Sequence, residues 1–376
     1  MNLSEKLRQF AFANGIEYLG IIDAEPLYEF EPYLEECRQR KIDPPFVQNS
    51  ISQRINPRLS LPGCQSIICL VLPYLPDYNK ITEAEPEEPV GLLSKIAQVR
   101  DYHQVMSQKA NQIVEYLQEI TSPIFNYLIH VDTGPLLERA FLQKAGLITG
   151  ENTTLITPKY GSWVVVGLIL LDIQLPSLPL EQTYSETCHN CGLCRQACPT
   201  GALLAPYQLN PWHCLSYISQ MKGIIPREYR NLLENRLYGC DTCQEVCPLN
   251  HDIKPSILPE FSSPILLPKL PLLTLSHINK KEFFSLIKPT AAGWVGRQTL
   301  RRNAIVAMGN SKFETTLPYL REILYNDRSY LMRNHAAWAL GQFNELPKVR
   351  EYLQRALLLE KDPRVIEEIK YSLQKS

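Results

Sequence analysis

The sequence contains no long hydrophobic segment. Its longest apolar run, WVVVGLILLDI from Trp163, is much shorter than the roughly 20 residues of a membrane-spanning helix, and its β-branched residues predict a strand. The N-terminal segment MNLSEKLRQF also lacks the apolar stretch of a signal peptide. We therefore expect a cytoplasmic protein without a membrane partner, in a compartment where thiols stay reduced.

The chain also has almost no net charge. Its 38 Lys and Arg residues nearly balance 39 Asp and Glu residues, for a formal net charge of −1, so the total charge indicates no class of partner. Residues 297–376 differ, with 14 basic against 9 acidic residues. Such an excess is usual for a solvated helical surface, and by itself it is weak support for nucleic-acid binding.

At 376 residues, the chain is too long for one ordinary hydrophobic core, and we expect several domains. Residues 1–178 alternate helix and strand patterns, which predicts an α/β domain. Residues 179–255 hold most of the cysteines, and residues 256–376 begin with a proline-rich linker and then become helical. In the first domain we expect helices over 3–15, 93–120 and 135–146, and buried strands over 18–24, 66–74, 126–132 and 163–172.

A repeat marks the helical C-terminal region. NAIVAMGN at Asn303 and HAAWALGQ at His335 share small residues that recur 32 positions apart, such as Ala304 and Ala336. A period near this value predicts HEAT-like helical repeats. A plain helical cap that covers the flank of the molecule is almost equally compatible with the pattern.

Eight of the 11 cysteines lie in two motifs. The first, C-x2-C-x2-C-x3-C-P, begins at Cys188, and the second, C-x25-C-x2-C-x3-C-P, begins at Cys214. In such motifs three thiolates bind one [4Fe–4S] cluster and the fourth, before Pro, binds the neighbouring cluster. We therefore predict two interlocked clusters in a bacterial-ferredoxin-like domain. The first ligand set is Cys188, Cys191, Cys194 and Cys247, and the second is Cys198, Cys214, Cys240 and Cys243.

Two zinc sites are the alternative to the clusters. Zinc sites favour paired C-x2-C motifs, and they give no role to the third cysteine or to the C-P ending. The other cysteines, Cys37, Cys64 and Cys69, lack such spacing and are expected to pack in the interior. Two adjacent clusters form a path for electrons, and the large preceding α/β domain is the expected place for the reaction that uses them.

Seven sequence blocks resemble the epoxyqueuosine reductase family, whose members complete the tRNA nucleoside queuosine. The blocks span essentially the whole chain and most lie outside the cysteine motifs, and the HEAT-like region belongs to the resemblance too. They are NPRLSLPGCQSIICLVLPY (56–74), RDYHQVM (100–106), VDTGPLLERAFLQKAGL (131–147), PKYGSWVVVGLIL (158–170), ACPTGAL (197–203), CLSYISQMKGIIP (214–226) and NRLYGCDTCQEVCPLN (235–250).

The resemblance implies a cobalamin in the N-terminal domain, which would be similar to cobalamin-processing and reductive-dehalogenase domains. The two clusters would pass electrons from an external low-potential donor to give Co(I). The enzyme would then reduce epoxyqueuosine to queuosine at the wobble position of tRNA, and two electrons and two protons would convert the epoxide to an alkene and water. The HEAT-like region would hold the anticodon stem-loop, and the chain is expected to be a monomer.

By resemblance, Asp132 is the proton donor. Opening an epoxide develops an alkoxide, so an acid is needed near the metal, and Asp132 follows a strand at the place where an α/β sheet forms its ligand crevice. A carboxyl group that stays protonated near neutral pH needs an apolar pocket to raise its pKa. The alternative is that Asp132 only caps the helix expected to begin at Pro135.

Two further segments are implied to line the cofactor. Asp101, Tyr102 and His103 can all face one site only where the expected helix begins or kinks, because consecutive helical residues point in different directions. The alternative is a surface Asp, a packed Tyr and a His with satisfied hydrogen bonds. The second segment is a predicted turn into a strand, in which a glycine could simply supply the turn. It consists of Tyr160, Gly161, Ser162 and Trp163.

Basic residues beside the repeat predict a ridge that faces RNA phosphates, although ordinary solvated helix surfaces have the same pattern. They are Lys280, Lys281, Arg297, Arg301, Arg302 and Arg333.

The chain also departs from the family pattern. It has Gln98 and Val99 where the family commonly has an aromatic residue and a glycine, and it has Glu151 where a lysine is usual. An anion in place of a cation reverses the local electrostatic potential. We therefore expect the details of cofactor or RNA contact to differ, but not the class of reaction.

Two other functions are compatible with parts of this pattern. A cobalamin- and iron–sulfur-dependent reductase of another epoxide or of a small organohalide would share the first two domains, but it would not need a HEAT-like region. An electron carrier or RNA-binding module without catalysis would need neither Asp132 nor the large α/β domain. Binding of a corrinoid and of a tRNA stem-loop distinguishes the three hypotheses.

Overall fold

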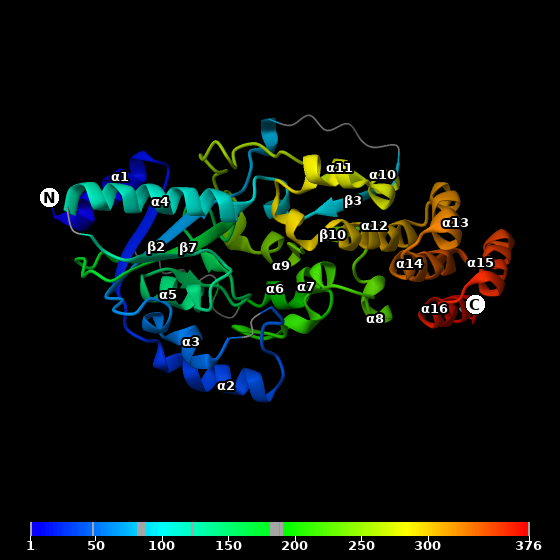
Figure 1. Ribbon diagram of the computed structural model, residues 1–376, viewed down its shortest axis with the longest axis horizontal. Helices are drawn as coiled ribbons and strands as arrows, with labels where there is room; N and C mark the ends of the chain where they lie inside the picture. Colours follow the sequence, from blue (N-terminus) through cyan, green and yellow to red (C-terminus); the bar gives the residue numbers. More distant parts are fainter. Residues whose placement is uncertain are drawn as a thin grey trace. The chain divides into compact units, whose positions relative to one another are not determined.

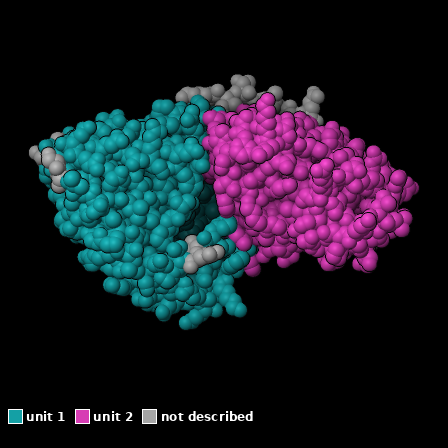
Figure 2. Space-filling model, in the orientation of Figure 1, with its two compact units in different colours: residues 1–80, 99–212, 242–264 teal, residues 81–98, 213–241, 265–376 magenta. Residues whose placement is uncertain are grey.

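The structure is a computed structural model that describes residues 2–46, 49–80, 88–121, 124–180, 188 and 191–374. The chain forms two compact units (Figure 2). Unit 1 contains residues 1–80, 99–212 and 242–264, and unit 2 contains residues 81–98, 213–241 and 265–376. Each unit is therefore built from three separate segments of the chain. The division into domains after residues 178 and 255 stays a prediction.

A four-stranded sheet in the order β1–β2–β7–β4 forms the centre of unit 1. Every neighbouring pair of strands in it is antiparallel. The expected mixture of helices and strands is present. Ligands bind outside the carboxyl ends of strands in parallel α/β sheets, so this rule does not place a ligand near Asp132 in an antiparallel sheet. The strands are β1 (Tyr18–Asp23), β2 (Ser66–Pro73), β4 (Tyr127–His130) and β7 (Val164–Leu171).

Helices cover both faces of this sheet. Helices α1 (Leu3–Ala13) and α4 (Tyr102–Thr121) lie on one face, and α5 (Glu138–Lys144) lies on the other (Figure 1). On the α5 face, Cys69 of β2 belongs to the same buried cluster as Phe141. Because successive strand residues point to opposite faces, a strand covered on both sides must be apolar throughout, and every residue of β2 is buried. All three cysteines outside the motifs are buried, as expected.

Three boundaries differ from the expected ones. The long helix expected from residue 93 begins at Tyr102, because residues 90–93 form a strand of unit 2. The helix expected at Pro135 begins at Glu138, since the Leu137 N–H donates to the carbonyl of Arg54 instead of entering a helix (2.9 Å). Strand β4 ends at His130 and lies at the edge of the sheet, and its first two residues are exposed.

Short elements complete unit 1. Strands β5 and β6 form an antiparallel pair, as do β8 and β9, and helices α6 and α9 pack against each other. These elements are α2 (Glu31–Gln39), α3 (Ile51–Ile55), β5 (Ile148–Thr149), β6 (Leu155–Ile156), α6 (Leu193–Ala197), β8 (Leu203–Ala205), β9 (Gln208–Leu209) and α9 (Thr242–Glu245).

Unit 2 combines a small sheet, in the order β10–β3–β11, with a succession of helices. Helix α12 packs on α14, and α14 packs on α16. A Cβ atom on Gly309 of α12 would lie 2.8 Å from Cα of Ala339 in α14, so the small repeated residues are what allow these helices to approach closely. The elements are β3 (Val90–Leu93), α7 (Leu215–Gln220), α8 (Arg227–Arg230), β10 (Arg236–Tyr238), β11 (Lys269–Pro271), α10 (Leu272–His277), α11 (Lys280–Glu282), α12 (Arg297–Ser311), α13 (Leu317–Asn326), α14 (Tyr330–Leu340), α15 (Pro347–Leu359) and α16 (Pro363–Gln374).

The helices of unit 2 share one hydrophobic core with its sheet and with α7. Leu237 of β10 and Leu215 of α7 belong to the same buried cluster as Ile305 of α12. Helix α12 is therefore an integral part of this unit, packed on both sides. None of the helices in the described part of the chain combines the length and the hydropathy that a membrane span requires.

Candidate functional site

Asp132 lies in a tight turn two residues beyond the end of β4. Its φ is +57°, in the left-handed region that residues with a side chain rarely adopt. The Thr133 N–H donates to the Val131 carbonyl across it (2.6 Å), and such an i to i+2 bond around a positive φ is the rare, strained form of the γ-turn. The residue is exposed. The turn thus presents a carboxylate in a conformation that the surrounding structure must stabilise. It does not cap α5, whose N-cap residue is Leu137.

The start of α4 brings Asp101, Tyr102 and His103 together. Asp101 precedes the helix, and its Oδ1 accepts a hydrogen bond from the His103 backbone N–H (3.1 Å) and lies 2.8 Å from His103 Nδ1. The backbone bond is of the kind made by an N-cap residue. The rings of Tyr102 and His103 are stacked, with their centroids 4.1 Å apart. The helix start that these three residues required is therefore present.

Two hydrogen bonds connect the Asp132 turn to the flanking helices. The Tyr102 hydroxyl donates to Asp132 Oδ2 (2.5 Å). From the other side, the Asp132 backbone N–H donates to Oε1 of Glu138 (2.8 Å), the first residue of α5. The start of α4, the turn after β4 and the start of α5 thus meet at Asp132.

Charge and burial favour protonated groups around Asp132. Burial raises the pKa of Glu138 to about 8, and the nearby charge of Asp132 adds to this effect. Burial alone would lower the pKa of His103, but the hydrogen bond and charge of Asp101 outweigh it, so this pKa lies above its ordinary value. The sequence analysis expected a raised carboxyl pKa at Asp132, but Asp132 is exposed, and the neighbouring carboxyl group whose pKa burial raises is that of Glu138.

Glu138 was missed by the sequence analysis. In a helix that begins at Pro135, Glu138 is an ordinary acidic residue of the first turn and draws no attention. A signal existed, because an acidic side chain in the first turn of a helix can reach back to a preceding backbone N–H, as in a capping box. In the structure the glutamate bonds the N–H of residue 132, six positions earlier.

The segment 160–163 is packed inside unit 1. Tyr160 is fully buried, and its hydroxyl donates to Oε2 of Glu17 (2.8 Å). The Ser162 N–H donates to Oδ1 of Asn250 (2.7 Å), and a Cβ atom on Gly161 (φ +55°) would lie 2.1 Å from the same oxygen. Trp163 is also buried. The segment therefore supports the chain that follows Cys247, and its contact with a cofactor stays a prediction.

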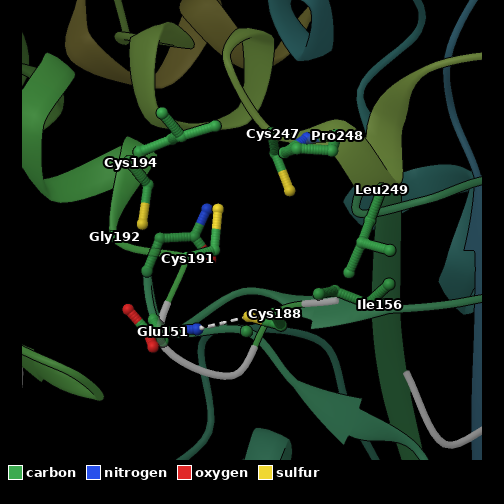
Figure 3. Close-up of a pocket in the computed structure, with 12 residues that line it drawn as sticks. Glu151, Ile156, Cys188, Cys191, Gly192, Cys194, Cys247, Pro248 and Leu249 are labelled. Carbon is green, nitrogen blue, oxygen red and sulfur yellow. Dashed lines mark hydrogen bonds between the residues drawn. The ribbon is translucent and has the colours of Figure 1, made fainter. Parts of the chain in front are cut away.

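The four cysteines of the first ligand set line one pocket of unit 1. Figure 3 shows their sulfur atoms directed toward a common space between the loop after β5, α6 and the Cys247 segment. The pKa of Cys247 lies above its ordinary value, first because of burial and then because Cys188 and Cys191 are close. Four thiols around one space fit a [4Fe–4S] cluster, which takes four cysteine ligands.

Glu151 also borders this pocket. Its backbone N–H donates to Sγ of Cys188 (3.4 Å). Its buried carboxylate lies 3.5 Å from Nε of Arg195, in α6. The acidic substitution noted in the sequence is therefore paired with a cation of the neighbouring helix. Gln98 and Val99, the other departures, are buried.

The second ligand set is divided between the units. Cys198 and Cys243 belong to unit 1, and Cys214 and Cys240 belong to unit 2. Burial would raise the pKa of Cys198, but the backbone N–H groups of Thr200, Leu203 and Ala202 outweigh it and lower that pKa. The assignment of the four residues to one cluster rests on their spacing.

The six basic residues proposed for RNA do not form one exposed ridge, and this expectation is corrected. Arg302 is fully buried and donates to the carbonyls of Met221 and Gly223. Arg301 is buried and pairs with Asp327, and Arg333 pairs with Glu360. A long cationic side chain can be buried with hydrogen-bonded partners inside a helical unit, or it can be exposed to solvent. The local sequence does not distinguish these two environments. Lys280 and Lys281 are exposed and Arg297 is half-buried.

Three family models match the chain: epoxyqueuosine reductase QueG at residues 54–133, a 4Fe–4S double cluster binding domain at residues 187–250, and HEAT repeats at residues 296–374. The epoxyqueuosine reductase of Bacillus subtilis is 33% identical over 383 residues, which cover 99% of this chain and 95% of the relative. The chain belongs to the epoxyqueuosine reductase family.

Solved structures of this family have the same fold. A crystal structure of epoxyqueuosine reductase with an epoxyqueuosine-modified stem-loop of tRNA-Tyr matches with a TM-score of 0.92 and 32% identity, over 99% of this chain and 98% of that chain. A structure of the Bacillus subtilis enzyme, in which the catalytic aspartate loop is swung out of the active site, matches with a TM-score of 0.91 and 31% identity over the same shares. The predicted architecture of an α/β region, a double-cluster region and HEAT-like repeats is confirmed.

Proposed function

We propose that the chain reduces epoxyqueuosine to queuosine at the wobble position of tRNA. Membership of the family supports this function, as does a relative of the same fold that binds an epoxyqueuosine-modified stem-loop. The observation that carries the proposal is the exposed Asp132 carboxylate, hydrogen-bonded by Tyr102 on a strained turn. Reduction of another epoxide or of an organohalide has no observation of its own in its favour.

The reaction needs a proton source more than it needs a base. Two electrons and two protons convert the epoxide to an alkene and water, and the first C–O bond to break leaves an alkoxide. Asp132 is the acid that protonates this oxygen, and Tyr102 orients its carboxyl group through the hydrogen bond to Oδ2. His103 and Glu138, whose pKa values are both raised, are the neighbouring groups from which the carboxylate can regain a proton.

The electrons are supplied by cofactors that the chain binds. The residues of the first ligand set fit a [4Fe–4S] cluster because all four line one pocket. The matched double-cluster model supports a second cluster, whose ligands we assign from the cysteine spacing. Cobalamin would supply a strongly reducing metal centre beside the epoxide. Asp101, Tyr102 and His103 are partly exposed next to Asp132, so they could line the space in which the epoxide would be protonated. Tyr160 and Trp163 are buried and present little surface to a cofactor.

The proposed partners are the anticodon stem-loop and an external low-potential electron donor, for a monomeric, cytoplasmic enzyme. Of the basic residues, Lys280, Lys281 and Arg297 are those that can reach RNA phosphates without leaving a buried site. Phosphate contacts of this kind weaken as salt concentration rises.

The direct test uses anaerobically purified protein, reconstituted with iron, sulfide and cobalamin. A stem-loop that carries epoxyqueuosine is incubated with the protein and a chemical reductant, and its nucleosides are separated and identified by mass. We expect a product lighter by one oxygen atom. Protein that retains its iron and cobalt yet leaves epoxyqueuosine unchanged, while it reduces a simple epoxide, would refute the proposed substrate.

A further inference from the structure

The Asp132 turn is strained, and hydrogen bonds from two helices hold it in place. Its backbone is in the left-handed region and closes on itself through the Thr133 N–H, a conformation that costs on the order of 1–3 kcal/mol unless other contacts offset it. Two residues later the chain approaches β4 so closely that a Cβ atom on Gly134 would lie 1.6 Å from Nδ1 of His130. No side chain larger than glycine's hydrogen fits there.

In the described part of the chain, two side chains form hydrogen bonds with Asp132, and they hold different parts of it. Tyr102 bonds the carboxylate, which can rotate away without any change in the backbone. Glu138 bonds the backbone N–H, so it fixes the turn itself. The position of Glu138 is fixed by its helix, because Phe141 and Leu142 of α5 pack into the buried cluster on that face of the sheet.

We propose that Glu138 is the positioning residue of this site: its carboxyl group holds the Asp132 turn folded in, within reach of the Tyr102 hydroxyl, and its loss lets the turn move away from α4. The consequence for catalysis rests on the proposed function, but the consequence for the turn does not.

The charges around Glu138 are consistent with a holding role. The groups that face it are Asp132, Arg139 and His103, and Asp132 is the strongest charge among them. Burial favours the neutral acid, which can accept the Asp132 N–H without placing a second negative charge beside that carboxylate. A glutamine has the same shape and the same acceptor oxygen, so it can replace the acid in this bond.

Hydrogen exchange, followed by mass spectrometry, tests the turn independently of any reaction. Three variants are compared with the full-length protein carrying its cofactors: Glu138→Ala, Glu138→Gln, and Glu115→Ala, which removes an exposed acid from α4. We expect the amides of residues 131–133 to exchange at least about tenfold faster in Glu138→Ala, the effect of losing one hydrogen bond to an acidic group. Glu138→Gln and Glu115→Ala should match the unsubstituted protein. Amides of β2 and β7 report whether the unit is still folded, and if they also exchange faster, Glu138→Asp, which is one methylene too short to reach the turn, replaces Glu138→Ala.

Kinetics on the epoxyqueuosine stem-loop test the consequence for catalysis. Loss of the holding contact should lower kcat of Glu138→Ala about tenfold or more, with KM within about twofold, since the acid is displaced but the RNA is still bound. Glu138→Gln should recover most of kcat. Unchanged exchange at residues 131–133 in Glu138→Ala would overturn the inference, and so would faster exchange with unchanged kcat. If the unsubstituted protein reduces no epoxyqueuosine, the proposed function fails, while the exchange data still decide whether Glu138 holds the turn.

Discussion

The Tyr102 hydroxyl lies 2.5 Å from Oδ2 of Asp132, although the two residues are 30 positions apart in the sequence. This bond joins the first residue of α4 to the turn after β4. It depends on the late start of the helix at Tyr102 and on the positive φ of Asp132. The site is thus assembled from two local features that neither residue reveals alone.

Removing the Tyr102 hydroxyl should disorient the acid without removing it. For Tyr102→Phe we expect the single-turnover rate of epoxyqueuosine reduction to fall about tenfold, the value of one well-placed hydrogen bond. Affinity for the stem-loop should stay within about twofold in a binding titration. A rate equal to that of the unsubstituted protein would show that Asp132 is positioned without Tyr102.

Glu138→Gln should change the pH dependence of folding stability. In the folded protein burial raises the pKa of Glu138 from 4.5 to about 8. Between these values the unfolded chain releases a proton that the folded chain keeps, so this group makes the free energy of unfolding fall as pH rises from about 5 to about 8. Glutamine cannot ionise, so the variant should gain stability relative to the unsubstituted protein across this range, by on the order of 3 kcal/mol at pH 8. Urea unfolding at pH 5 and pH 8 measures the difference, and an equal difference at both values would contradict the prediction.

The interlocked ligand sets predict the iron content of double variants. Cys191 and Cys247 line one pocket and are assigned to the same set, so Cys191→Ser, Cys247→Ser and the double variant should each keep about four of the roughly eight iron atoms of two clusters. The double variant of Cys191 and Cys198, which belong to different sets in this assignment, should lose both clusters. Ligand sets made of consecutive cysteines predict the reverse pattern, with both clusters lost when Cys191 and Cys247 are replaced together. Iron analysis and electron paramagnetic resonance of reconstituted protein distinguish the two.

Arg302 should matter for stability and not for RNA affinity directly. Burial lowers its pKa to about 9, and its guanidinium satisfies the carbonyls of Met221 and Gly223. Arg302→Met leaves these buried acceptors without a donor, and we expect the free energy of unfolding to fall by about 3 kcal/mol or more. Lys281→Ala, the exposed control, should leave stability unchanged and weaken stem-loop binding at low salt. A stable Arg302→Met variant that only loses RNA affinity would contradict this assignment.

Sequence patterns predicted the parts of this protein that follow local rules. Apolar runs located β2 and β7, and the cysteine spacing predicted a pocket that Cys188 and Cys247 share despite their separation. The patterns failed where long-range contacts decide. Residues 90–93 pair with β10 and β11 and so shorten the expected long helix, and the antiparallel order of the main sheet has no local signal.

The same limit applies to side chains with two plausible environments. Arg302 was expected on the surface from its sequence pattern, but it is buried and donates to two backbone carbonyls. These acceptors lie 79 and 81 residues earlier in the chain, so no local pattern reveals them. Glu138 has the sequence of a helix-starting acid, yet its partner is the backbone of Asp132. Only the fold brings such partners together.

The central claim, that Asp132 supplies the proton in epoxyqueuosine reduction, is tested most directly by single-turnover reduction of the modified stem-loop with Asp132→Asn. The variant and the unsubstituted protein are compared at equal iron and cobalt content, with the same reductant. Asparagine keeps the size of the side chain but is not an acid. We therefore expect both proteins to bind the stem-loop, and the unsubstituted protein to form queuosine at least about 100-fold faster than the variant. Equal rates in the two proteins would contradict the claim.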